Sequence, residues 1–161
     1  MPFPACCGCT GWAVRFHMRV LGIDFGERRV GLAITDASAT LARPLRTLRR
    51  KTSVPQLVAD LLAEIDQLIQ EDGLARIVIG LPLRLDGSPT GLTERVRALA
   101  VRVAAHTRVP VVIQDERLTS REAEQRLALR ERDWRKRKAK LDAAAAAVIL
   151  QDYLDEHPTG S

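Results

Sequence analysis

The stretch RVLGIDFGERRVGLAIT, residues 19–35, decides the expected fold. Arg19 to Asp24 is an apolar run that breaks at Gly26, and a second apolar run, Val30 to Thr35, follows a short polar turn. Each run has the length and composition of a buried strand. A parallel crossover would need a dozen or more residues, so the short turn predicts an antiparallel hairpin.

The rest of the chain extends this hairpin into a sheet with helices. A third strand is expected from Leu41 to Leu48, at an edge because of Pro44. Apolar residues at helical spacing follow, with a capping pair Ser53 and Gln56 and a stop at Gly73. The further expected elements are a helix at 54–69, a strand at 76–80, a helix at 90–106, a strand at 109–114, and helices at 119–129 and 141–154.

This order, three strands followed by alternating helices and strands, predicts the fold class. We expect an α/β domain with a mixed five-stranded sheet, in which the first three strands form an antiparallel meander and helices cover both faces. The chain has 161 residues, which suits one domain, and we place it at residues 18–157. No run approaches the roughly 18 apolar residues of a membrane span, and we expect a cytoplasmic protein with no membrane partner.

The first 17 residues show no periodicity and are expected to be a disordered extension. They hold all three cysteines, Cys6, Cys7 and Cys9. Cys6 and Cys9 form a CxxC, which could be a redox pair or half of a zinc site, but no second ligand pair follows at suitable spacing. Met18 opens the first strand, and we hypothesise that it is the true start.

Positive charge is concentrated near the end of the chain. Between Arg130 and Lys140, seven basic residues stand against two acidic ones, a net of +5 that equals the formal charge of the whole chain. Such a segment can be a solvated loop, but it can also neutralise phosphates and release counterions. Because it abuts a candidate acidic site, we favour contact with nucleic acid. The residues assigned to this contact are Arg117, Arg135, Lys136, Arg137, Lys138 and Lys140.

Acidic residues stand where two expected strands end. Asp24 closes the first strand and Glu116, beside Asp115, closes the fifth, while Asp142 opens the last expected helix. Singly, Glu116 could pair with an arginine and Asp142 could interact with a helix N-terminus. Asp24 is harder to explain structurally, since an acid in an apolar strand is costly unless it is paired or metal-bound. Together the acids predict a site for Mg²⁺ or Mn²⁺, which prefer oxygen ligands and can catalyse phosphodiester hydrolysis.

Four stretches make the chain resemble the YqgF family, also called RuvX, which is described as Holliday-junction-resolvase-like. They are GIDFGERRVGLA (22–33), GLPLRLDG (80–87), DERLTS (115–120) and KLDAAA (140–145). The resemblance covers about Met18 to Leu154. It implies an RNase H-like fold related to the RuvC resolvases and a metal-dependent nuclease, with Mg²⁺ or Mn²⁺ as cofactor. The implied role is maturation of the 5′ end of the 16S ribosomal RNA precursor.

The resemblance also implies roles for single residues. By motif position, Asp24 is the first-strand metal ligand, Glu116 the second acid and Asp142 the helix acid, with Asp115 as a weaker fourth candidate. The loop from Gly80 to Gly87, with Asp86-Gly87 as its turn, is expected to position substrate, and Lys140 to touch phosphate. The RuvC resolvases carry two acids on the last helix, whereas this chain has Ala145 three residues after Asp142. The sequence therefore leaves open whether the site holds one metal ion or two.

Several alternatives remain. The protein could resolve branched DNA in the manner of a Holliday-junction resolvase, which would require a homodimer; a monomer or a homodimer fits the sequence. It could also be a non-catalytic RNA-binding factor in ribosome assembly or transcription. An ATPase of the actin or hexokinase type is disfavoured, because such proteins need two domains and a second Gly-rich turn.

Overall fold

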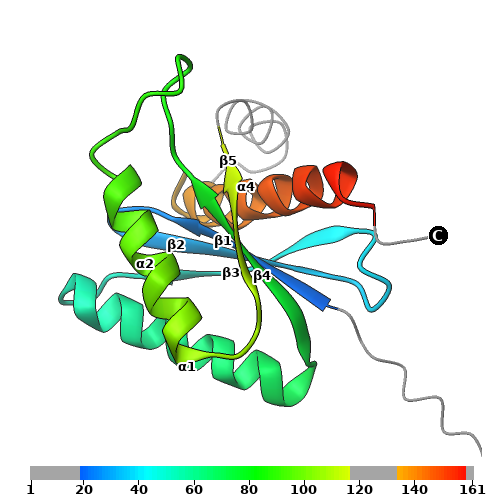
Figure 1. Ribbon diagram of the computed structural model, residues 1–161. Coiled ribbons are helices and arrows are strands. Elements are labelled where there is room, and N and C mark those ends of the chain that lie inside the picture. Colours follow the sequence, from blue (N-terminus) through cyan, green and yellow to red (C-terminus); the bar gives the residue numbers. More distant parts are fainter. Residues whose placement is uncertain (1–18, 117–133, 159–161) are drawn as a thin grey trace, which may run out of the picture.

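The computed structural model describes residues 19–116 and 134–158. Strands and helices alternate along the chain much as the sequence predicts (Figure 1). The elements are β1 (Arg19–Phe25), β2 (Arg29–Thr35), β3 (Ala42–Arg49), α1 (Val54–Glu71), β4 (Leu74–Leu81), α2 (Thr93–His106), β5 (Val111–Asp115) and α4 (Trp134–Glu156).

The five strands form one mixed sheet in the order β3-β2-β1-β4-β5. β1, β2 and β3 pair antiparallel, whereas β4 runs parallel to β1 and β5 parallel to β4. This confirms the predicted meander and the mixed sheet. The carboxyl ends of β1, β4 and β5 therefore lie at one edge, the place where ligands collect in open α/β sheets.

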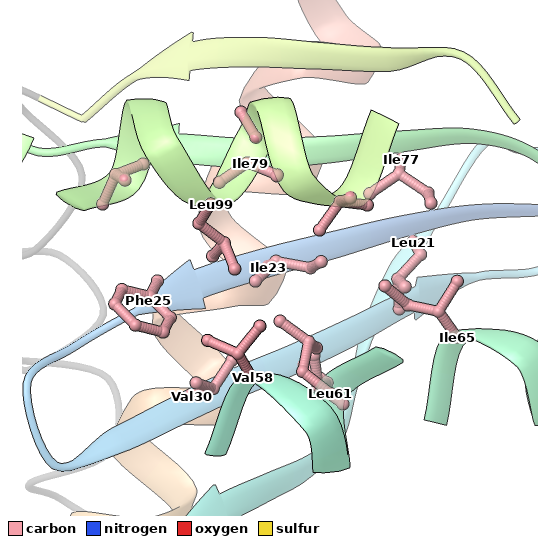
Figure 2. Packing of buried hydrophobic residues seen from close by; sticks show 14 of the residues in the cluster. Leu21, Ile23, Phe25, Val30, Val58, Leu61, Ile65, Ile77, Ile79 and Leu99 are labelled. Atoms are coloured by element: carbon pink, nitrogen blue, oxygen red, sulfur yellow. The ribbon is translucent and has the colours of Figure 1, made fainter. Parts of the chain in front are cut away.

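α1 and α2 cover one face of the sheet and form the larger part of the core (Figure 1). Residues of β1 at alternate positions, Leu21, Ile23 and Phe25, pack there, as the period of two in a strand requires. Figure 2 shows these side chains between the two helices, with Val58 and Leu61 of α1 on one side. This face is closed mainly by apolar side chains, with Glu64 of α1 and Thr93 of α2 also buried.

α4 covers the other face and lies unusually close to it (Figure 1). Glycines make this approach possible: a Cβ atom at Gly22 would lie 2.8 Å from Leu150 Cβ, and one at Gly31 would lie 1.9 Å from the backbone oxygen of Asp142. Gly31 is also the Cα partner of Asp24 across the β1–β2 ladder. The small residues of β2 thus bring the segment around Asp142 down onto the sheet beside Asp24.

Local signals predicted the boundaries of α1 correctly. The Ser53 side chain accepts a hydrogen bond from the Gln56 backbone nitrogen at 3.3 Å, and Gly73 follows the helix with a φ of 70°. Both are the expected start and stop of a helix. The other described elements differ from the prediction by only a few residues at their ends, except α4.

The start of α4 was predicted wrongly. The helix begins at Trp134, so its first residues belong to the segment that we had interpreted as a basic loop. Arginine, lysine and alanine are good helix formers, and residues 134–140 contain neither glycine nor proline. The change from basic to apolar residues near Leu141 predicted a boundary, but it lies inside the helix. The expected helix at 119–129 and the extension before Met18 lie outside the described residues.

Among the described residues, no helix combines the length and the apolar character needed to cross a bilayer.

Candidate active site

Three carboxylates approach one another on the face that α4 covers. Asp24 is the last residue but one of β1, Glu116 directly follows β5, and Asp142 lies on α4. β1 and β5 are not neighbours, since β4 lies between them. The carboxylates can meet only if β4 leaves room where the three strands end.

Gly80 on β4 supplies that room. A Cβ atom at this position would lie 2.0 Å from Glu116 Oε1 and 2.8 Å from Ile149 Cδ1 of α4. The Glu116 carboxylate thus occupies the space that any larger residue at position 80 would fill. The expectation that the loop from Gly80 to Gly87 positions substrate stays a prediction; Gly80 itself is buried and lies within β4, which includes the strand expected at 76–80. Its role is to admit Glu116.

Burial and mutual repulsion raise the pKa of two of these acids. Burial raises the pKa of Asp24 to about 6, and the charge of Asp142 adds to the rise. Burial also raises the pKa of Glu116 to about 8, with further contributions from the charges of Asp24 and then Asp115. Each charge thus opposes its neighbours, and acids shifted in this way mark functional sites more often than structural ones.

We expect the metal-free protein to lose stability as the pH rises from 6 to 8. Between the ordinary pKa of 4.5 and the folded-state pKa of about 8, the folded protein holds a proton on Glu116 that the unfolded chain has lost. Stability falls with pH wherever the folded state binds more protons. The expected loss is about 1 to 2 kcal/mol, measured by thermal unfolding in EDTA at both pH values.

Glu116→Gln provides the control for this pH dependence. The variant carries no titrating group at position 116, so its stability should change much less between pH 6 and pH 8. An equal loss of stability in the variant would show that another group causes the effect.

Asp142 is held by a basic residue of the hairpin. Arg29 Nη1 lies 3.6 Å from Asp142 Oδ2, a separation too long for a hydrogen bond, so the contact is electrostatic. Asp142 lies eight residues after the start of α4, well beyond its first turn. The alternative that Asp142 interacts with the helix N-terminus is therefore wrong.

The three carboxylates suit a hard divalent cation, but they do not form a complete set of metal ligands in this structure. Asp24 interacts electrostatically with both Asp142 and Glu116. Within residues 19–116 and 141–158, however, no three His, Cys, Asp or Glu side chains already form a cluster able to hold a metal ion. The residues fit a cation by their chemistry, since all the converging groups are carboxylates that a positive charge would relieve.

Comparison with known proteins agrees with this arrangement. The profile of the RuvX family, described as Holliday junction resolvase, matches residues 18–156. The chain belongs to the RuvX family. A relative from Anaeromyxobacter dehalogenans is 42% identical over 138 residues, which are 86% of this chain and 97% of the relative. One from Chloroflexus aurantiacus is 43% identical over 136 residues, 84% and 86% of the two chains. Both carry the provisional name pre-16S rRNA nuclease.

Solved structures confirm the fold. RuvC of Thermus thermophilus in complex with a Holliday junction substrate matches with a TM-score of 0.53 at 18% identity, over 89% of this chain and 98% of that one. A second structure of RuvC from Thermus thermophilus matches with a TM-score of 0.50 at 17% identity, over 88% of this chain and 98% of that one. The RuvX chain therefore has the expected RNase H-like fold.

The structure also describes three further predicted site residues, Asp115, Asp86 and Gly87. Asp115 ends β5, and its charge contributes to the raised pKa of Glu116. Asp86 and Gly87 form a turn in the loop after β4, where Asp86 Oδ1 accepts hydrogen bonds from the backbone and the hydroxyl of Ser88. Gly87 has a φ of 85°, which glycine adopts readily.

Most of the predicted nucleic-acid contacts lie outside the described part of the structure. Arg117 is not described at all, and for the residues of α4 before Leu141 only the helical backbone is described. The predicted contacts in that part of α4 are Arg135, Lys136, Arg137, Lys138 and Lys140.

Sequence reasoning missed a second group of basic residues, gathered where β2 begins and β3 ends. Arg29 at the start of β2 pairs with Arg49 at the end of β3, and the Arg50 backbone nitrogen donates to the Arg28 oxygen at 2.9 Å. Arg28, Arg49 and Arg50 are exposed. The RRK run at 49–51 was visible in the sequence, but only the strand pairing shows that it adjoins the hairpin turn.

Proposed function

We propose that this protein is a metal-dependent nuclease whose site consists of Asp24, Glu116 and Asp142. The observation that carries the proposal is the convergence of these acids, with Gly80 leaving space for Glu116 and burial raising the pKa of Asp24 and Glu116. Membership of the RuvX family and the names of the curated relatives support a nuclease function. Asp115 is a further candidate at the same edge of the sheet.

We propose precursor 16S ribosomal RNA as the substrate, with cleavage that matures its 5′ end. The names of the relatives support this choice. The exposed arginines at the β2–β3 edge suit a polyanion, because each can bind phosphate. Residues Arg117, Arg135, Lys136, Arg137, Lys138 and Lys140 are proposed as additional contacts.

The residues that would hold Mg²⁺ or Mn²⁺ are the three carboxylates. When bound, a divalent cation activates water and stabilises the leaving oxygen of the phosphodiester. Asp24 interacts electrostatically with both Asp142 and Glu116, so it would contribute most to holding the cation. Glu116 carries a proton at neutral pH in the metal-free protein, and that proton would be released on metal binding. Arg29 keeps Asp142 directed toward the hairpin.

The decisive experiment compares two substrates side by side. End-labelled precursor ribosomal RNA and a synthetic four-way DNA junction are incubated with the protein in Mn²⁺, in Mg²⁺ and in EDTA. We expect cutting of the RNA with either metal and none in EDTA. RNA binding without cutting under all three conditions would contradict the nuclease proposal and favour a binding factor in ribosome assembly.

Resolution of branched DNA is the second candidate, favoured by the description of the family model. In that case the four-way junction would be cut with metal and the RNA left intact. Paired incisions in a junction would also require two active sites, so the active species would be a dimer.

A further inference from the structure

A cavity opens at the same edge of the sheet as the carboxylates but on the face opposite α4. Its volume is about 400 Å³, within the usual range for small-ligand pockets. Phe25, the residue after Asp24, lines it together with Val54 and Val58 from the start of α1. Figure 2 shows Phe25 at the end of β1, with Val58 of α1 and Leu99 of α2 nearby.

One stripe of α2 forms the remaining wall. Arg95, Ala98, Leu99 and Arg102 all line the cavity, and their spacing of three, four and seven residues places them on one side of the helix. The two central residues are apolar and the two outer ones are arginines. The cavity is therefore an apolar slot with a guanidinium at each end of one wall.

The arginines remain available for a ligand. Arg95 Nη1 lies 3.6 Å from Glu27 Oε1. The Arg95 side chain is 59% exposed and the Glu27 side chain 69%, so this ion pair is weak. The Arg102 side chain forms no ion pair or hydrogen bond with any residue in the described ranges. Two cations at the rim of an apolar slot match a ligand that is flat and apolar in one part and anionic in another.

We propose that this cavity binds one nucleotide of a single-stranded segment of the substrate, adjacent to the nucleotide that is cut. The base lies in the cavity against Phe25, Val58 and Leu99, and the flanking phosphates contact Arg95 and Arg102. Single-stranded RNA is commonly recognised through bases that are unstacked and inserted between side chains. A paired base in a duplex could not enter the slot.

The position of the cavity connects it to the acidic site. Successive residues of a strand point to opposite faces, so Asp24 faces α4 while Phe25 faces the cavity. Both features lie at the end of β1, and a strand that crosses this edge of the sheet meets both. The inference rests on the proposed nuclease function and assigns it a preference for single strands.

Filling the cavity tests the proposal directly. Ala98 is exposed, so Ala98→Phe adds a ring to the slot without disturbing the core. Binding of a short labelled oligoribonucleotide is measured by fluorescence anisotropy in EDTA, in a protein that also carries Asp24→Asn. We expect Ala98→Phe to weaken binding about 10-fold. Ala104→Phe, at an exposed position of α2 outside the cavity, is the matched control and should bind normally.

A second pair of variants tests the phosphate contacts. Arg102→Gln should weaken binding and should lower the slope of log affinity against log salt by about 0.7, the value for one phosphate contact in a single strand. Arg97→Gln removes an arginine of the same helix that is bound to Glu94 and does not line the cavity. It should leave the slope almost unchanged. Thermal unfolding of each variant establishes that it is folded.

The outcomes separate this inference from the proposed function. Normal binding by Ala98→Phe, or equal weakening by Ala98→Phe and Ala104→Phe, would overturn the nucleotide site. Equal sensitivity of a blunt duplex to Ala98→Phe, or no binding of the single strand by the parent protein, would overturn it as well. Because binding is measured without cleavage, failure of the nuclease proposal would appear instead as an uncut RNA in the metal assay.

Discussion

Asp24→Asn is expected to lower metal-dependent cleavage by about 1,000-fold and to raise the melting temperature of the metal-free protein. The loss of activity follows because the stabilisation that a bound metal gives to the transition state is worth several kcal/mol, and each 1.4 kcal/mol is a factor of ten in rate. Asp24 interacts with both other acids, so its removal should weaken the whole site.

The gain in stability follows from the raised pKa of the same residue. At pH 7.5 the folded protein must keep Asp24 charged although burial and Asp142 raise its pKa to about 6. A shift of about two units costs the folded state up to about 3 kcal/mol, and a neutral amide of the same shape removes most of that cost. For a chain of this size the melting temperature in EDTA should increase by about 5 °C.

A matched variant controls for the loss of an acid elsewhere. Asp66 on α1 is exposed, and its carboxylate pairs with the surface residue His106 at an Oδ2–Nε2 distance of 2.9 Å. Asp66→Asn should therefore leave cleavage unchanged. In addition, Mn²⁺ should raise the melting temperature of the wild type but hardly that of Asp24→Asn. Full cleavage by Asp24→Asn would remove this residue from the site.

Gly80→Ala is expected to reduce cleavage by about 100-fold with only a moderate loss of stability. The new Cβ atom would lie 2.0 Å from Glu116 Oε1, so the carboxylate must move away. Displacing a catalytic group by about 1 Å commonly costs a factor of 100 in rate. The atoms that must give way are the ends of the Glu116 and Ile149 side chains and no backbone atom, so the fold should tolerate the change at a moderate cost.

Gly91→Ala is the matched control for Gly80→Ala. A Cβ atom at Gly91 meets no other atom within 4 Å, so both cleavage and melting temperature should stay close to those of the wild type. Steady-state cleavage and thermal unfolding of the two variants are measured together. If Gly80→Ala cut RNA at the wild-type rate, the packing of Glu116 against position 80 would have no part in catalysis.

The fold could be predicted from the sequence because its signals are local. The short connection between the first two apolar runs fixes an antiparallel pair, and the cap at Ser53 with the stop at Gly73 fixes α1. The start of α4 could not be predicted in the same way. Its first residues are helix formers without apolar periodicity, and a helix shows such periodicity only where one side is covered by the core.

The candidate site was predictable in its acids but not in the residues that make it possible. Asp24 and Glu116 stand out because they end apolar runs. Gly80 was expected at the end of a strand, but nothing in the sequence shows that its Cα faces the carboxylate of Glu116, which follows β5. The pairing of Arg29 with Asp142 is equally hidden, because it joins a hairpin turn to a helix more than 100 residues later.

The order of the acids along the chain has a consequence for how the protein is made. Asp24 is synthesised early, Glu116 after most of the sheet, and Asp142 only with the C-terminal helix, which must settle onto Gly31 before the acids meet. Domains acquire their native packing as units once the necessary chain is available. With the proposed site, a nascent chain therefore cannot assemble the three acids, and cannot cleave RNA, before α4 has been synthesised and has packed on the sheet.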